Sequence, residues 1–121
     1  MFTIYVYVLD TLADWELGYV ISELNSGRFF KKGEQRVSLK TVSYSKEPIN
    51  TMGGMTIVPN CLIDDIVVSE TSMLLLPGAD TWNDPKHGAI IEFILFQSES
   101  PGFLHIILNN RYKFAMVLSN L

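Results

Sequence analysis

Residues 3–9 of this 121-residue chain read Thr-Ile-Tyr-Val-Tyr-Val-Leu, a run that is apolar or aromatic at nearly every position. A continuous run of this kind is typical of a β-strand that is covered on both faces, as the strands of parallel sheets are. Beyond a polar turn, apolar residues recur at helical spacing at Leu17, Val20, Ile21 and Leu24. This spacing predicts a helix that has Asp14 as its N-cap and stops at Gly27.

The middle of the chain predicts a second strand and a hairpin. Residues 37–44 alternate between apolar and polar side chains, which favours a strand. Residues 49–59 read as a small β-hairpin that turns at Gly53-Gly54. Residues 62–68 are consistent with one helical turn or with an irregular crossover, and the pattern does not decide between them.

The rest of the chain adds two strands and a helix. Residues 73–76 form the third core strand, and residues 85–96 have helical periodicity opened by Asp84-Pro85, an N-cap followed by proline. Residues 103–108 predict a fourth parallel strand. The order predicts one α/β domain with a doubly wound, mostly parallel, flavodoxin-like sheet flanked by helices. We expect this domain to span residues 1–121, with residues 97–121 as a divergent tail.

Charge and cysteine content limit the expected partners. Nine basic and thirteen acidic residues give a net charge of -4, and no basic cluster exceeds Lys31-Lys32, so we expect no nucleic-acid partner. The apolar runs are too short to span a bilayer, and no secretory signal precedes the first strand, so we expect a cytoplasmic protein without a membrane partner. The single cysteine, Cys61, can form neither an internal disulfide nor a structural zinc site. Without a glycine-rich or Walker-type nucleotide loop, we expect no cofactor and no metal.

Three blocks of sequence carry a resemblance to a known family. They are residues 6–16 (VYVLDTLADWE), 51–59 (TMGGMTIVP) and 74–82 (LLLPGADTW). In this order and spacing they resemble the ThiJ/PfpI family of the class I glutamine amidotransferase-like superfamily, especially its bacterial intracellular-protease branch. The resemblance covers about residues 3–92. It implies cysteine-dependent chemistry on small or peptide-like substrates, and it allows a homodimer.

The resemblance also implies positions for a site. Glu16 stands where the family has an acid that hydrogen-bonds to the nucleophile; the alternative is an acid that the helix dipole favours in a first turn. Gly78 and Ala79 stand where a loop supplies amides to an oxyanion. Relatives usually have Gly-Gly there, so Ala79 preserves the loop only if its φ is not positive. Asp10 and Asp80 would flank the same crevice.

The nucleophile that the family requires is missing from its place. Relatives carry a cysteine on the turn after the strand at residues 103–108, where this chain has residues 109–111, Asn-Asn-Arg. We interpret Cys61 as a small, partly buried apolar residue. We interpret His87 as a surface residue and His105 as a core or interface residue. Relative to the family, we expect the domain to be incomplete at its C-terminal end.

Three functions follow, in this order of preference. The first is a non-catalytic remnant of the family fold, with an exposed sheet edge that promotes self-association. The second is a cysteine-dependent hydrolase, amidase or glyoxalase-like enzyme, which would need Cys61 or a partner chain to complete its site. The third is a small-molecule-binding or stress-response module that uses Asp10, Glu16, Gly78 and Asp80.

Overall fold

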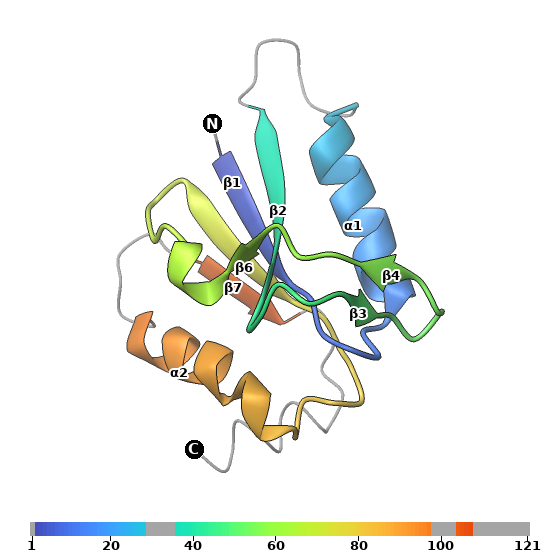
Figure 1. Cartoon of the computed structure of the whole chain (residues 1–121). Helices are drawn as coiled ribbons and strands as arrows, with labels where there is room; N and C mark the ends of the chain where they lie inside the picture. The colour runs from blue at the N-terminus through green and yellow to red at the C-terminus, as the bar shows by residue number, and fades with distance from the viewer. Residues whose placement is uncertain (1, 29–35, 98–103, 108–121) are drawn as a thin grey trace.

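The computed structural model describes residues 2–28, 36–97 and 104–107 (Figure 1). Five strands form one sheet in the order β5-β2-β1-β6-β7, and every pairing in it is parallel. The strands are β1 (Phe2–Tyr7), β2 (Val37–Ser43), β5 (Cys61–Leu62), β6 (Ser72–Leu76) and β7 (Leu104–Ile107). The predicted parallel α/β sheet is confirmed, including its fourth long strand.

The order of the strands shows how the chain winds around the sheet. From β1 the chain moves outward in one direction to β2, and it then returns across β1 to β6 and continues in the opposite direction to β7. Because parallel crossovers are right-handed, this reversal puts α1 (Asp14–Ser26) and α2 (Gly88–Gln97) on opposite faces. Figure 1 shows the sheet between the two helices. The order β2-β1-β6-β7 is the doubly wound, flavodoxin-like order.

The core is centred on β1 and the residues that continue it. Every side chain from Ile4 to Leu9 is at most 3% exposed, as expected for a strand covered on both faces. Leu74, Leu75 and Leu76 of β6 are equally buried, and Ile90, Ile91 and Ile94 of α2 belong to the same core cluster. Each such side chain stabilises the fold by about 1.5–3 kcal/mol relative to an exposed one.

Helix α1 begins one residue earlier than the sequence predicts, with a different cap. Ala13 is the N-cap, and no side chain caps the helix there. Asp14 is the first helical residue, so the prediction that it is the N-cap is wrong. Its carboxylate instead accepts hydrogen bonds from the Thr51 hydroxyl (2.6 Å) and the Gly53 N–H (2.7 Å). The Asp14 carboxylate therefore binds the hairpin and does not act as the N-cap of the helix.

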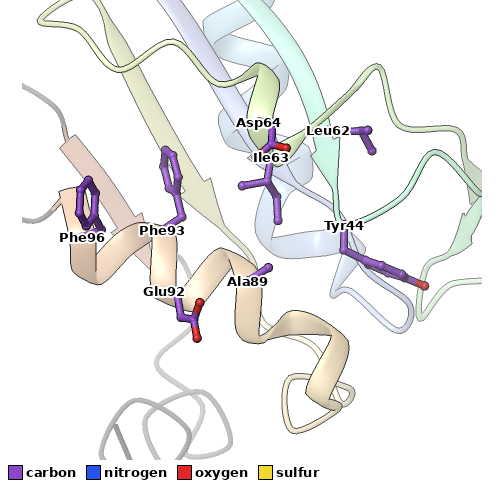
Figure 2. Close-up of a pocket in the computed structure, with 8 residues that line it drawn as sticks. All are labelled: Tyr44, Leu62, Ile63, Asp64, Ala89, Glu92, Phe93 and Phe96. Atoms are coloured by element: carbon purple, nitrogen blue, oxygen red, sulfur yellow. The ribbon is translucent and has the colours of Figure 1, made fainter.

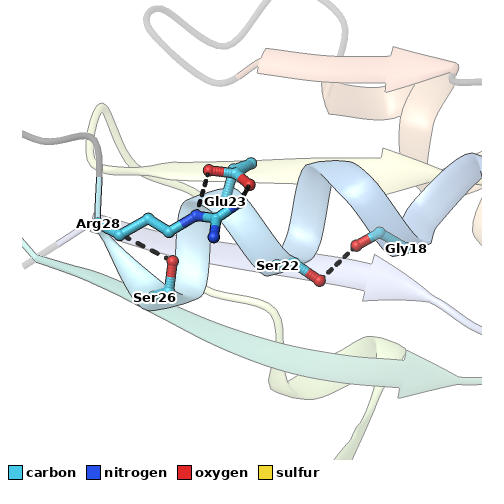
Figure 3. Close-up of polar contacts among 5 residues, drawn as sticks. All are labelled: Gly18, Ser22, Glu23, Ser26 and Arg28. Carbon is cyan, nitrogen blue, oxygen red and sulfur yellow. Dashed lines mark hydrogen bonds and ion pairs between the residues drawn. The ribbon is translucent and has the colours of Figure 1, made fainter.

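Helix α1 ends at a glycine, as predicted. Gly27 has a φ of 63°, in the left-handed region, and its N–H donates to the Glu23 carbonyl (3.2 Å). Figure 3 shows the same end of the helix, where the Arg28 guanidinium pairs with the Glu23 carboxylate. One turn earlier, the Ser22 hydroxyl donates to the Gly18 carbonyl (2.6 Å). Arg28 is largely exposed, so its ion pair contributes little to stability.

The predicted hairpin is confirmed, and the undecided segment after it is resolved. Strands β3 (Ile49–Asn50) and β4 (Thr56–Ile57) pair antiparallel around a turn in which Gly54 has a φ of 88°. The chain then forms β5 at the edge of the main sheet and the 3-10 turn η1 (Ile63–Asp65). Residues 62–68 therefore contain one 3-10 turn, within a connection from β2 to β6 that is otherwise irregular.

The second predicted helix begins as a 3-10 turn. Asp84 is the N-cap of η2 (Pro85–His87), and its Oδ1 accepts from the Lys86 N–H (3.1 Å). The helix α2 continues from Gly88, so the Asp84-Pro85 start signal is confirmed. In the described part of the chain, no helix is both long and apolar enough to cross a bilayer. The predictions for residues 109–121, and for residues 98–103 and 108, lie outside the described residues.

Candidate functional site at the carboxyl ends of the central strands

The strand order reverses between β1 and β6, which pair side by side along Thr3–Val6 and Ser72–Leu75. In doubly wound sheets, ligands bind beyond the carboxyl ends of the strands at such a reversal. Here the loop of residues 8–13 leaves β1, and the loop of residues 77–84 leaves β6. All the residues that the sequence predicts for the crevice belong to these two loops or to the first turn of α1.

Hydrogen bonds tie the two loops together. The Ala13 N–H donates to the Gly78 carbonyl (2.8 Å), and the Asp80 N–H donates to the Thr11 hydroxyl (2.8 Å). Trp82 closes the second loop on itself, because its buried indole N–H donates to the Pro77 carbonyl (2.8 Å). These bonds place Gly78 beside Ala13, the N-cap of α1, and Asp80 beside Thr11 in the loop after β1, and a ligand-binding crevice there stays a prediction.

The hairpin joins the same network through Asp10. The half-buried Asp10 accepts from the Asn50 N–H at its Oδ1 (2.9 Å) and from the Thr81 hydroxyl at its carbonyl (2.7 Å). The Thr11 N–H donates to the Asn50 carbonyl (2.8 Å). Asp10 therefore holds three segments in place, whereas Asp80 is exposed. A role for either carboxylate in ligand binding stays a prediction.

Thr11 is a site residue that the sequence analysis missed. Its φ is 69°, and it is the non-glycine residue with positive φ in the described part of the chain. A β-branched residue in this region is strained by about 1–3 kcal/mol, and such strain gathers at functional sites. The sequence signal is weak, since Thr11 stands out only by following a buried strand at the start of a turn.

Glu16 lies in the first turn of α1, where its N–H donates to the Ala13 carbonyl (3.1 Å). Its side chain is half-buried, and its Oε1 atom is shielded from solvent. The Ala13 N–H donates to the Gly78 carbonyl, so Glu16 lies beside the point where the two loops are joined. This placement fits a site acid and fits a first-turn acid near the helix dipole, so the acid role stays a prediction.

Ala79 meets the condition set for the amide loop. It is 2% exposed, and it is not among the described residues that have positive φ. An alanine therefore fits this position without the strain that a left-handed conformation would cause. The neighbouring Asp80 amide already binds the Thr11 hydroxyl, so the amides of Gly78 and Ala79 are the candidates for an oxyanion role. That role stays a prediction.

Comparison with known proteins identifies the family. The model of the DJ-1/PfpI family matches residues 2–98. The chain belongs to the DJ-1/PfpI family. The match extends slightly beyond the range of about residues 3–92 that the three sequence blocks indicate, and it confirms the ThiJ/PfpI resemblance.

Individual DJ-1/PfpI relatives agree in sequence and in structure. The chain is 40% identical over 89 residues to "Uncharacterized protease YoaZ" of Bacillus subtilis (strain 168), which covers 74% of this chain and 42% of that protein. A thiJ/pfpI family protein from Bacillus anthracis is 39% identical with a TM-score of 0.80, covering 88% of this chain and 51% of that one. The DJ-1 superfamily protein Atu0886 from Agrobacterium tumefaciens shares the fold at 16% identity, with a TM-score of 0.62 and coverage of 88% and 52%. The chain thus spans about half the length of these relatives.

Cys61 lies far from the DJ-1/PfpI crevice. It belongs to β5, which is separated from β1 by β2, or roughly 10 Å at the usual strand spacing. Its Sγ lies 3.6 Å from the Thr41 carbonyl oxygen. Burial, and then the nearby Asp65 carboxylate, raise the pKa of the Cys61 thiol. The half-buried, poorly ionised thiol agrees with the interpretation of Cys61 as a small apolar residue.

His87 is buried, so its interpretation as a surface residue is wrong. Its Nδ1 shares a 2.7 Å hydrogen bond with the Tyr7 hydroxyl, and its ring is fully covered, with edge contacts to Tyr44 and Trp82. Burial, and then the Lys86 charge, lower the pKa of His87 to about 4. A signal existed in the sequence, because position 87 precedes Ile90 and Ile91 by three and four residues and shares their helical face. The side chain of His105 lies outside the described residues.

Proposed function

We propose that these residues form a DJ-1/PfpI scaffold that carries the acid and the amide loop of the family site without its nucleophile. On this proposal the chain by itself has no thiol-dependent hydrolase or glyoxalase-like activity. The observation that carries the proposal is the position of Cys61, the one cysteine of the sequence, in the edge strand β5. Covalent thiol catalysis requires the sulfur within hydrogen-bonding reach of its acid or base.

The environment of Cys61 supports the same proposal. A catalytic cysteine is activated by positive charge or a helix N-terminus that lowers its pKa. Burial and the Asp65 carboxylate act in the opposite direction on Cys61 and raise its pKa. Glu16 and Ala79, in contrast, belong to segments joined through Ala13 and Gly78. The segments that carry Glu16 and Ala79 are therefore hydrogen-bonded to each other, whereas the thiol of Cys61 lies in the edge strand β5.

Thiol reactivity and turnover test this proposal together. We expect iodoacetamide to alkylate Cys61 slowly at neutral pH, with a rate that rises only at more alkaline pH than for free cysteine. We expect the wild type and Cys61→Ser to give the same background signal with a fluorogenic peptide and with methylglyoxal. Turnover that disappears in Cys61→Ser would show that the thiol acts and would contradict the proposal.

Two observations favour a second candidate function, a thiol hydrolase completed by further residues or by a partner chain. The Bacillus subtilis relative is called a protease, and this chain covers 42% of it. The crevice loops are also held in order, with Ala79 free of positive φ. This candidate predicts peptide hydrolysis that iodoacetamide stops and that Glu16→Gln reduces, measured on the same fluorogenic peptide.

The proposal includes a cytoplasmic protein that forms a homodimer. A chain with a single cysteine gains no internal disulfide from an oxidising compartment, which favours a reducing one. The dimer rests on the family resemblance and on exposed apolar side chains, which include Tyr19 and Met55.

A further inference from the structure

A groove opens between α2 and the segment that contains η1 (Figure 2). Its volume is about 500 Å³, within the range of small-molecule sites. One wall consists of Ala89, Glu92, Phe93 and Phe96 from α2, and the facing wall consists of Tyr44, Leu62, Ile63 and Asp64. None of these residues belongs to the crevice at the ends of β1 and β6, so the groove is a separate site.

The groove combines aromatic surface with negative charge. Phe93 and Ile63 extend into the space between the two walls, and Tyr44 stands at one end (Figure 2). Asp64 and Glu92 add one carboxylate to each wall, and the eight lining residues include no cation. The groove therefore offers apolar contact and two anions to an occupant.

These two carboxylates have no partner of their own in the described part of the chain. The ion pairs there are Arg28 with Glu23 and Lys86 with Asp84, and no hydrogen bond involves the side chain of Asp64 or Glu92. Lys86 stands over the Tyr44 ring at 5.1 Å, with its Nζ 3.7 Å from Asp84. The charge of Lys86 is thus shared with Asp84, and the Tyr44 ring already attracts an ammonium group.

We propose that the groove between α2 and η1 binds a small organic cation, an ammonium group carried on an aromatic body. The aromatic body packs against Phe93 and Ile63, and the ammonium pairs with the Asp64 or the Glu92 carboxylate at the rim of the groove. Charge complementarity selects this class of ligand, because the eight lining residues carry two carboxylates and no cation, and the Lys86 ammonium over the Tyr44 ring is already paired with Asp84. The inference is independent of the proposed function, since it uses neither the crevice nor Cys61.

A charge-matched ligand series tests the proposal on the full chain. Tryptamine, tryptophol and indole-3-propionate share one ring system and differ in the charge of the side arm. We expect saturable amide shifts in a ¹⁵N NMR titration at Asp64, Ala89 and Phe93. Each exposed charge pair contributes modestly, so tryptamine binds about threefold to tenfold more tightly than tryptophol. Indole-3-propionate binds more weakly than both.

Variants separate the charge from the apolar surface. Asp64→Asn with Glu92→Gln brings the tryptamine affinity down to that of tryptophol. The matched control, Glu47→Gln with Glu70→Gln, removes two exposed charges outside the groove and leaves the preference unchanged. Ala89→Phe fills the groove from an exposed helix position and weakens both ligands. Circular dichroism verifies that each variant is folded.

Three results would overturn the proposal. One is equal affinity for tryptamine and tryptophol, which reduces the groove to an unselective apolar surface. Another is a tryptamine preference that survives Asp64→Asn with Glu92→Gln. The last is the absence of saturable shifts at groove residues up to about 10 mM tryptamine, because binding weaker than this would not make the groove a specific site.

Discussion

At the scale of single residues, His87 makes the stability of the fold depend on pH. The folded chain holds His87 with a pKa of about 4, because burial disfavours its charge, whereas an unfolded histidine has a pKa of about 6.5. Between these values the unfolded chain binds a proton that the folded chain does not bind. The contribution of neutral, buried His87 to the free energy of unfolding is therefore fully present above about pH 6.5 and is lost as the pH falls toward 4.

We expect the free energy of unfolding to fall by about 3 kcal/mol between pH 7 and pH 4 on account of His87. Urea unfolding followed by tryptophan fluorescence measures it. His87→Asn is less stable at pH 7, because it leaves a cavity beside Tyr7 and Trp82, but it lacks this loss on acidification. A variant that loses as much stability as the wild type between these pH values would show that other groups cause the effect.

Two single residues, His87 and Thr11, have environments that the sequence alone does not predict. His87 and Tyr7 are 80 positions apart, so a hydrogen bond between them leaves no local pattern. The helical register places His87 on the buried face, yet its polarity favours a surface interpretation. For Thr11, a β-branched residue type disfavours the observed positive φ, and the residue bonds to Asn50 and Asp80, which are distant along the chain.

At the scale of elements, the hairpin docks on the start of α1 through Asp14. Its Oδ2 accepts from Thr51 and its Oδ1 accepts from Gly53. A Cβ at Gly53 would lie 2.9 Å from the Asp14 Oδ2, while one at Gly54 meets no atom within 4 Å. Gly53 is therefore required by its contact with α1.

We expect Gly53→Ala to destabilise the fold by about 1–2 kcal/mol, because Asp14 must move and lose its hydrogen bonds. In the background of Asp14→Ala, the same substitution costs much less. A double-mutant cycle from urea unfolding at pH 7 measures this coupling. Equal costs of Gly53→Ala in both backgrounds would contradict the contact. Lowering the pH provides a control, since the depressed pKa of Asp14 means that its contribution is present above about pH 4 and lost below it.

At the scale of the whole molecule, the described sheet ends in an unpaired edge. Among the described strands, β7 pairs with β6 and with no other strand. Large apolar side chains are also exposed, including Tyr19 at 73% and Phe96 at 84%. An edge strand and exposed apolar groups favour association between chains.

We expect the mass from light scattering to rise above that of one chain, 13.7 kDa, as the concentration increases. Apolar association persists at high salt, whereas association through surface charges weakens, so a sodium chloride series distinguishes the two. A monomer mass at every concentration would contradict this expectation and the proposed homodimer together.

The sequence by itself determined the fold class and the family. The apolar run at residues 3–9, the helical spacing after Asp14 and the turn at Gly53-Gly54 are local patterns, and each acts through propensity and burial over a few residues. They therefore predicted the strands, the hairpin, the end of α1 and the start of the second helix. The family blocks also predicted that Glu16 and Gly78 belong to one site, and that role stays a prediction.

Only the tertiary structure decided how these elements hold one another. In the folded chain, Asp14 binds the hairpin and His87 is buried against Tyr7. Thr11 adopts a positive φ, and Cys61 lies in an edge strand away from the crevice. Each of these outcomes depends on partners that are distant along the chain. Packing brings such partners together, and the pattern of neighbouring residues does not encode which of them meet.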